Sequence, residues 1–352
     1  MTTDEWMTMP CPAPSAEHRA AAEARQEILT KPAGSLGTLE RLAIRLAALQ
    51  ETERPRADAA RIILFAGDHG ITAQGVSAYP PAVTVQMLHN FAQGGAAISV
   101  LARKLGAPLE VIDAGTLATE RIPGVICDKP LCGTRDFSLQ PAMTRQELLF
   151  ALEAGRRAVQ RAREHALDLL ILGEMGIGNT AASAAIASAL LAKPPAILVG
   201  AGSGLDDAGL KQKSRVISEA LDLHGLMRPD VSATEVLERV GGLEIAALSG
   251  AIISAAQARI PVLTDGFIVT VAALAAVRLN PTCREWLIFS HRSQEQGHQQ
   301  VLDALGAEPI LDLRLRLGEG SGAAVALPIV RLACALHAEM ATFVEADVSG
   351  PA

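Results

Sequence analysis

The chain has 352 residues, of which 49% are hydrophobic, and its formal net charge is −7. This length can hold one large domain or two unequal ones, and an acidic chain without a basic block argues against a nucleic-acid or membrane-surface protein. The five cysteines form no CxxC pair, so we expect no disulfide framework and no zinc ribbon, but reduced thiols in a cytoplasm.

The N-terminal region predicts helices rather than strands. Residues 1–14 lack a basic segment followed by an apolar core, so we expect no signal peptide, and no apolar run is long enough to span a bilayer. Apolar residues at helical spacing predict helices over 18–28 and 39–50, joined by a glycine-rich loop. Because no strand precedes these helices, we expect a separate helical lobe.

From residue 61 onward, short apolar runs alternate with helix-like segments. The runs are residues 62–65, 109–112, 167–172, 196–199, 261–263, 286–289 and 310–317. This alternation is typical of βαβ units, so we expect an α/β fold: a mostly parallel sheet with helices on both faces, as a Rossmann-like three-layer arrangement. A final helix is expected over 324–344.

Glycines and polar or charged residues follow these predicted strands. They lie in residues 66–70, 113–116, 173–178, 200–207, 265–266, 290–293 and 318–322. Right-handed crossovers place the carboxyl ends of all parallel strands at one edge of the sheet. Ligands of open α/β sheets bind at that edge, so we expect the functional site there.

Residues 173–180, with the sequence GEMGIGNT, predict a strand, a tight turn and a helix. Glycines allow a close approach to a ligand, and the free N–H groups of the helix suit an anion such as phosphate. Asn179 and Thr180 can cap the helix or donate to the ligand. The segment matches neither GxGxxG nor a P-loop, and a turn without a ligand is the alternative interpretation.

Two charged residues fit a phosphate-handling site. Glu319 lies between Gly318 and Gly320, where backbone amides can tune its pKa for proton transfer. An acidic first turn of a helix is the alternative for this residue. Lys213 follows the loop 200–207 and can reach a phosphate held at the turn, although a surface lysine is the commoner case.

Two other constellations are weaker. His291, Glu295 and His298 are spaced to share one face of a helix starting at Ser290, so a metal site is geometrically possible, but a solvated face is favoured and we expect no metal. Asp68 and His69 form a carboxylate–histidine pair without a recognisable nucleophile elbow, which argues against an acyl-transfer triad.

Taken together, the motifs resemble those of the nicotinate-nucleotide:5,6-dimethylbenzimidazole phosphoribosyltransferase family. They are KPAGSLGTLE at 31–40, FAGDHGI at 65–71, VSAYPPAVTVQMLHNFAQGGAAI at 76–98, GEMGIGNT at 173–180, VGAGSGLDDAGLKQK at 199–213, GGLEIAALSGA at 241–251, PVLTDGFI at 261–268, SHRSQEQGH at 290–298 and LRLGEGSGAA at 315–324. The chain departs from the family pattern at Ala181, where a threonine is usual, and at Asp136, where an asparagine is usual.

The resemblance implies transfer of phosphoribose from nicotinate mononucleotide to 5,6-dimethylbenzimidazole, giving α-ribazole 5′-phosphate and nicotinate in cobalamin lower-ligand synthesis. Nicotinate leaves as a neutral ring from a pyridinium, so we expect neither a metal nor another cofactor. The attacking base must lose a proton, and the resemblance makes Glu319 the general base. Glu174 is expected on the ribose or nicotinate side.

The resemblance also implies the remaining site residues. The base is expected near Tyr79, Gln86 and Met87. The phosphate is expected on Gly176, Gly178, Asn179 and Thr180, assisted by Lys213 and Ser290. A homodimer is implied, with a small helical domain of residues 1–58 together with 328–352 and a catalytic domain of 59–327. The acceptor base stays open, since a flat apolar slot can admit benzimidazoles, purines or phenols. A nucleotide sensor without turnover and a metal-dependent hydrolase are the rival functions.

Overall fold

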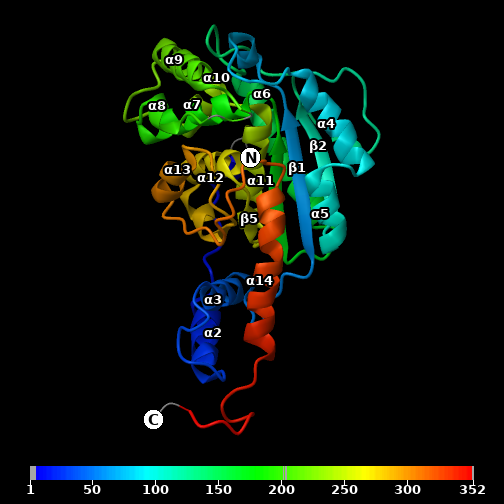
Figure 1. The fold of residues 1–352 in the computed structure, drawn as a ribbon, viewed down its shortest axis with the longest axis vertical. Helices are drawn as coiled ribbons and strands as arrows, with labels where there is room; N and C mark the ends of the chain where they lie inside the picture. The colour runs from blue at the N-terminus through cyan, green and yellow to red at the C-terminus, as the bar shows by residue number, and fades with distance from the viewer. Residues whose placement is uncertain (1–4, 201, 203, 351–352) are drawn as a thin grey trace.

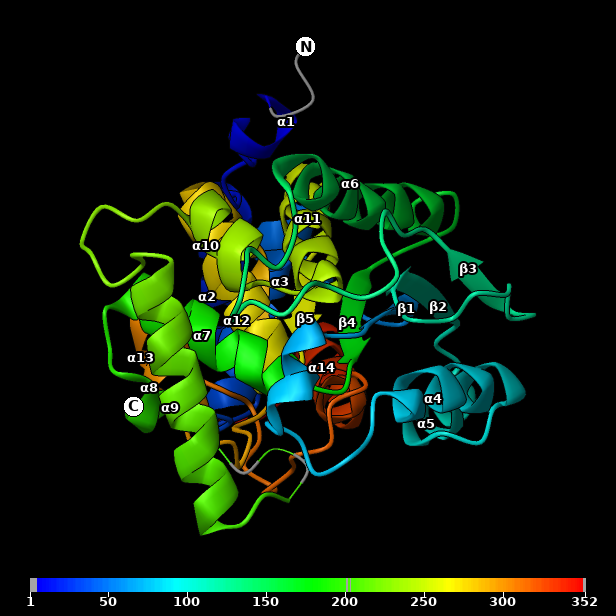
Figure 2. The same cartoon turned by 90° about the horizontal axis from the view of Figure 1, so that it is seen from above.

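The computed structural model of the chain describes residues 5–200, 202 and 204–350. Its sheet is parallel throughout and has the order β3-β2-β1-β4-β5-β6. The strands are β1 (Ala60–Gly67), β2 (Leu109–Gly115), β3 (Val125–Cys127), β4 (Leu169–Met175), β5 (Val262–Thr264) and β6 (Leu287–Phe289). Helices lie on both sides of this sheet (Figure 2), which confirms the predicted α/β fold.

Successive side chains of the central strands point alternately into two separate apolar cores, one on each face of the sheet. In β1, Ile63 and Phe65 face one core, and Ile62 and Leu64 face the other. The first core is covered by α6 (Arg145–Ala162), α7 (Asn179–Leu191), α11 (Leu243–Gln257) and α12 (Phe267–Leu279). The second is covered by α3 (Thr38–Gln50), α4 (Ala82–Gln93), α5 (Ala97–Leu105) and α14 (Ser321–Glu339). Burial on both faces explains the continuous apolar runs.

Segments near the two ends of the chain, residues 16–50 and the end of α14, meet below the sheet. Figure 1 shows α2 (Ala16–Ile28), α3 and the C-terminal part of α14 together there. Leu29 forms an antiparallel bridge with Thr342, and the Arg25 guanidinium donates to three carbonyls at the end of α14. However, α14 runs continuously from the sheet into this lobe, so the division into residues 1–58 with 328–352 and 59–327 stays a prediction.

Two of the predicted strands are wrong. Residues 196–199 largely belong to the short helix α8 (Pro195–Leu198), because Pro195 has the φ angle of a first helical residue and lacks the N–H that a strand needs. Residues 310–317 form no strand: the Ile310 N–H donates to the Phe289 carbonyl of β6 and Leu311 forms a single bridge with His291, but Leu313 and Leu317 stay exposed. The edge strand β3, of three residues, was too short to be predicted.

The remaining elements are α1 (Glu5–Thr8), α9 (Asp207–Leu223), α10 (Ala233–Val240), α13 (His298–Ala304) and the 3₁₀-helices η1 (Gly70–Gln74) and η2 (Pro281–Trp286). The final helix begins at Ser321 and ends at Glu339, earlier at both ends than the predicted 324–344. Within the described part of the chain, only α14 is long and apolar enough to cross a membrane. It packs against β4 and α5 as a core helix does.

Candidate active site

A cavity of about 670 Å³ opens at the carboxyl edge of the sheet. Its volume is within the range of small-molecule sites. Residues from β4, from the start of α7 and from the segment before α14 line it. Among the predicted site residues, those that line it are Tyr79, Met87, Glu174, Gly176, Gly178, Asn179, Thr180 and Glu319.

The turn between β4 and α7 forms one wall of this cavity. Gly178 is the N-cap of α7 with φ of 96°, a conformation that favours glycine. A side chain on Gly176 would collide with the carbonyl oxygen of Gly67 in β1. Only glycine fits there, and the turn lies directly against the neighbouring strand. In the first turn of α7, the N–H groups of Asn179 and Ala181 donate to the Gly176 and Gly178 carbonyls, so the Thr180 N–H and hydroxyl are the groups of this turn left to face the cavity.

Lys213 lies behind this turn rather than on the surface. Its side chain is fully buried on α9, and its Nζ donates to Thr180 Oγ1 at 2.7 Å and to the Gly200 carbonyl at 3.4 Å. Burial lowers the pKa of Lys213 to about 8, partly offset by the nearby Glu295 carboxylate. The alternative of a surface lysine is therefore wrong. The Lys213 ammonium group lies behind the turn and contacts it through the Thr180 hydroxyl.

Glu319 is held in place by contacts from several elements. It adopts φ of 66° although it is not a glycine, and Gly318 and Gly320 flank it at 88° and 85°. Its N–H donates to the Glu174 carbonyl at 3.2 Å, and its Oε2 accepts from the Ile98 N–H at the start of α5 at 3.2 Å. These contacts position the carboxylate on the cavity wall.

Asp265, which follows β5, fixes the backbone beside Glu319. Its carboxylate accepts from the N–H groups of Gly320 and Ala323, each at 3.0 Å. Sequence reasoning noted Asp265 only as an edge residue, although it also lines the cavity. The strained conformation of Glu319 is thus maintained by hydrogen bonds from its loop to Glu174 of β4 and to Asp265, the residue after β5.

The acidic groups of the cavity raise one another's pKa values. Burial raises the pKa of Glu319, the Ile98 N–H lowers it, and the charge of Asp265 raises it again. The pKa of Glu174 lies well above its ordinary value because of complete burial and the charges of Asp265 and Glu244, although Asn179 Nδ2 donates to its carboxylate. A raised pKa makes a carboxylate a better proton acceptor near neutral pH.

Three predicted residues lie apart from the cavity wall. Gln86 is exposed on α4, and Lys213 and Ser290 are buried behind the lining residues. The Ser290 hydroxyl lies 2.9 Å from Nδ1 of His291, which does line the cavity. Phe267 and Ile268 also line it and were not singled out from the sequence, although they lie in the motif PVLTDGFI.

The metal interpretation fails on geometry. Residues 290–297 form no helix, and α13 starts only at His298, so His291, Glu295 and His298 do not share a helix face. Both ring nitrogens of His298 are engaged, one by the Ser293 N–H at 2.8 Å and the other by the Thr270 hydroxyl at 3.0 Å. The described residues contain no group of three potential metal ligands.

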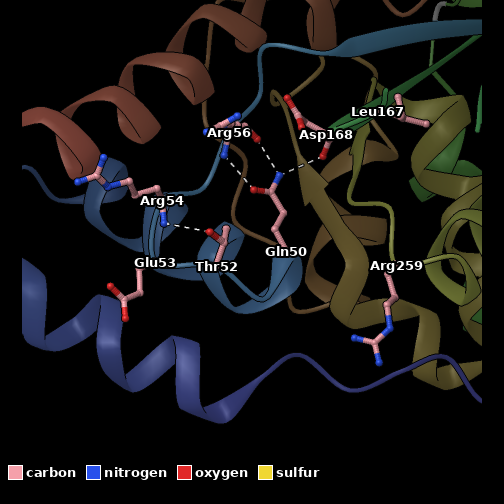
Figure 3. Close-up of a pocket in the computed structure, with 8 residues that line it drawn as sticks. All are labelled: Gln50, Thr52, Glu53, Arg54, Arg56, Leu167, Asp168 and Arg259. Atoms are coloured by element: carbon pink, nitrogen blue, oxygen red, sulfur yellow. Dashed lines mark hydrogen bonds between the residues drawn. The ribbon is translucent and has the colours of Figure 1, made fainter. Parts of the chain in front are cut away.

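A second cavity, of about 580 Å³, lies at the opposite edge, where the strands begin. Figure 3 shows its lining, in which the Gln50 side chain bonds to the Arg56 backbone and to the Asp168 carbonyl. The guanidinium groups of Arg54 and Arg259 lie on different sides of the hollow and do not converge. This cavity presents no arrangement of groups directed at one ligand.

Comparison with known proteins identifies the family of the chain. A family model described as phosphoribosyltransferase matches residues 11–348, which places the chain in that class of enzymes. The nicotinate-nucleotide–dimethylbenzimidazole phosphoribosyltransferase of Bradyrhizobium sp. strain BTAi1 is 63% identical over 346 residues, 98% of each chain. The enzyme of the same name from Pseudomonas aeruginosa PAO1 is 56% identical, again over 98% of each chain.

A solved structure is also similar. The crystal structure of CobT from Thermus thermophilus has a TM-score of 0.91 and 43% sequence identity, and the match covers 95% of this chain and 100% of that one. The chain belongs to the nicotinate-nucleotide–dimethylbenzimidazole phosphoribosyltransferase family. The resemblance predicted from the motifs is therefore confirmed.

Proposed function

We propose that the chain transfers phosphoribose from nicotinate mononucleotide to 5,6-dimethylbenzimidazole, giving α-ribazole 5′-phosphate and nicotinate for the lower ligand of cobalamin, and that the carboxyl-edge cavity is its active site. The names of the relatives support the reaction. One observation carries the assignment of the site: Glu319 and the turn of residues 176–180 line the same cavity.

The turn is suited to the phosphate of the nucleotide. Backbone N–H groups at the start of α7 bind an anion without a charged side chain, and the Thr180 hydroxyl lies between the cavity and Lys213. A phosphate there returns Lys213 to its fully charged form, since an anion favours the protonated amine. Ser290 assists indirectly by holding His291.

Glu319 acts as the general base. As the bond from the ribose to nicotinate breaks, its electrons pass to the pyridinium nitrogen, so nicotinate leaves with a neutral ring. One nitrogen of the benzimidazole forms the new bond to the same carbon with its lone pair. The other nitrogen then releases its proton to the Glu319 carboxylate, a role that contributes about 10²–10⁴ in rate.

The incoming base occupies the apolar side of the cavity. Tyr79, Met87 and Phe267 line this region, and flat aromatic bases bury their faces against such side chains. Attack on the side opposite to nicotinate inverts the anomeric carbon from β to α. We place Glu174 on the ribose or nicotinate side, where burial and the neighbouring acidic groups raise its pKa. The remaining rate enhancement comes from orientation, because the cavity holds nicotinate and the incoming base on opposite faces of the same ribose.

A homodimer in the cytoplasm completes the proposal. The helical lobe presents Leu332 and Val344 at its surface, and both are more than half exposed. Light scattering on the purified protein tests the oligomeric state, and a monomer at micromolar concentration would remove this part of the proposal without affecting the chemistry.

The reaction itself is tested by incubating the purified protein with nicotinate mononucleotide and a panel of benzimidazoles, purines and phenols. We expect the mass of an α-ribazole phosphate together with free nicotinate, and no loss of rate in EDTA. Nucleotide binding without any product would favour the nucleotide sensor. Ribose phosphate as the only product, abolished by EDTA, would favour the metal-dependent hydrolase.

A further inference from the structure

A buried histidine–carboxylate pair lies beneath the proposed phosphate site. His69 follows β1, and Glu244 lies in the first turn of α11. The His69 Nε2–H donates to Glu244 Oε1 at 2.6 Å, and neither side chain has exposed surface. Neither residue lines the cavity, and the proposed chemistry uses neither. A polar pair buried this deeply needs a reason, since desolvation opposes it.

The turn after β4 rests on this pair. A methyl group added to Gly176 would lie 3.1 Å from Glu244 Oε1 and 3.3 Å from His69 Nε2. One added to Gly178 would lie 3.1 Å from His69 Cβ. Both glycines of the turn are therefore packed against the pair with no room for an intervening group. A shift of the imidazole or the carboxylate moves the turn with it.

A second contact ties the same turn to the segment after β1. The Ile177 N–H donates to Thr84 Oγ1 at 3.1 Å, and Thr84 lies on α4. A contact from α4 and the packing of His69 therefore hold the turn from two sides. This arrangement fixes the direction in which the N–H groups of the turn point.

We propose that His69 and Glu244 are positioning residues for the phosphate of the nucleotide. Their hydrogen bond holds the 176–178 backbone so that the N–H groups of Gly176 and Gly178, rather than the Ile177 N–H that Thr84 binds, face the bound anion. The inference rests on the proposed function, because it takes the turn to be the phosphate site. A directional, charge-assisted hydrogen bond in a buried environment is well suited to this task, and a displacement of about 1 Å can cost as much as about a hundredfold in activity.

A purely structural role must be separated from positioning, since breaking any buried polar pair destabilises a protein. The chain contains a matched control. Gln26 Nε2 and His337 Nδ1 form a buried pair at 2.8 Å in the helical lobe, far from the cavity. Loss of this pair is expected to lower the melting temperature while the KM values of both substrates stay within about twofold of wild type.

The experiment compares steady-state kinetics and melting temperatures of the full-length variants. Glu244→Asp keeps the charge but withdraws the carboxylate, and His69→Gln keeps an N–H donor near Nε2. We expect Glu244→Asp to raise the KM for nicotinate mononucleotide about tenfold and to leave the KM for the base within about twofold. His69→Gln should fall between this variant and wild type. Gln26→Leu and His337→Ala serve as the controls.

A double-mutant cycle sharpens the test. If the two residues act as a unit, His69→Ala with Glu244→Ala should raise the nucleotide KM no more than either change alone. Should Glu244→Asp and His69→Gln lower only the melting temperature, as the control pair does, the positioning role is excluded. Lys213→Ala in the same series separates the two proposals: if it too leaves the nucleotide KM unchanged, the phosphate site itself is misplaced.

Discussion

The two edges of the sheet carry cavities of similar size and different character. The cavity at the carboxyl edge, about 670 Å³, is lined by buried acidic groups with raised pKa values and by glycines at positive φ. The cavity at the amino edge, about 580 Å³, is lined by exposed arginines, by other polar side chains and by a glutamine whose amide is bonded to the backbone. Volume alone does not identify a site.

At the carboxyl edge, a strained backbone is held in place by hydrogen bonds from neighbouring residues. Glu319 keeps a left-handed backbone because Glu174, Asp265 and Ile98 bond to its loop. Such strain persists only where the surroundings enforce it, and it concentrates at functional sites. At the amino edge, Arg259 is paired with Glu51 on the surface. Among the described residues that line this cavity, every buried polar side-chain atom has a hydrogen-bond partner.

The largest effect is expected from Glu319→Gln. This change keeps the shape and removes the proton acceptor, so kcat should fall at least about a hundredfold while nucleotide binding is retained. Single-turnover kinetics and calorimetric titration with nicotinate mononucleotide measure the two quantities. A kcat close to that of wild type would exclude Glu319 as the base.

The pH profile tests the same residue independently. Because burial and Asp265 raise the pKa of Glu319 above 4.5, its carboxylate is lost as the pH falls through that raised value. The kcat/KM of wild type should therefore decline on the acid side of neutrality, and the residual activity of Glu319→Gln should not follow this decline. An identical acid limb in both proteins would assign it to another group.

The second effect in size is expected from Lys213→Ala. Loss of a buried cation behind Thr180 removes a charge-assisted contact of about 1.5–3 kcal/mol, which corresponds to a rise of about ten- to a hundredfold in the KM for nicotinate mononucleotide. Lys193, which bonds to Gln300 away from the cavity, provides the control as Lys193→Ala. Equal KM values for the two variants would place the phosphate elsewhere.

Site residues could be predicted from the sequence where the residues next to them in the chain form a recognisable pattern. Glu319 stands between two glycines and the turn at 176–178 follows an apolar run, so both could be recognised locally. His69 and Glu244 could not be paired, because 175 positions separate them and neither lies in a periodic pattern. The same limit explains the strand predicted at 310–317: its alternation is genuine, but the sequence does not say that the sheet ends at β6.

A smaller effect, on stability, is expected from Glu174→Gln. The folded-state pKa of Glu174 is raised above 4.5, so the folded protein binds this proton more tightly than the unfolded chain does. The resulting stabilisation is present below pH 4.5 and is lost as the pH rises through the folded-state pKa. The glutamine side chain of the variant cannot ionise, so the variant does not lose this stabilisation as the pH rises. Its melting temperature should exceed that of wild type by about 2–4 °C at about pH 8 and by less at about pH 5.

The control for this prediction is Glu308→Gln, which alters a side chain that is 82% exposed. Its melting temperature should follow that of wild type at both pH values, because surface changes alter stability little. A difference between Glu174→Gln and wild type that does not grow with pH would show that another group carries the effect.

The smallest effect is expected at the amino edge, where Arg54→Gln and Arg259→Gln should leave kcat and both KM values within about twofold of wild type. Their guanidinium groups are exposed and do not converge, so each change should also alter the free energy of unfolding by less than about 0.5 kcal/mol. The product assay and thermal melts measure both. A selective rise in the KM of either substrate would mean that the arginines act on the active site across the sheet, and the contrast between the two edges would then be wrong.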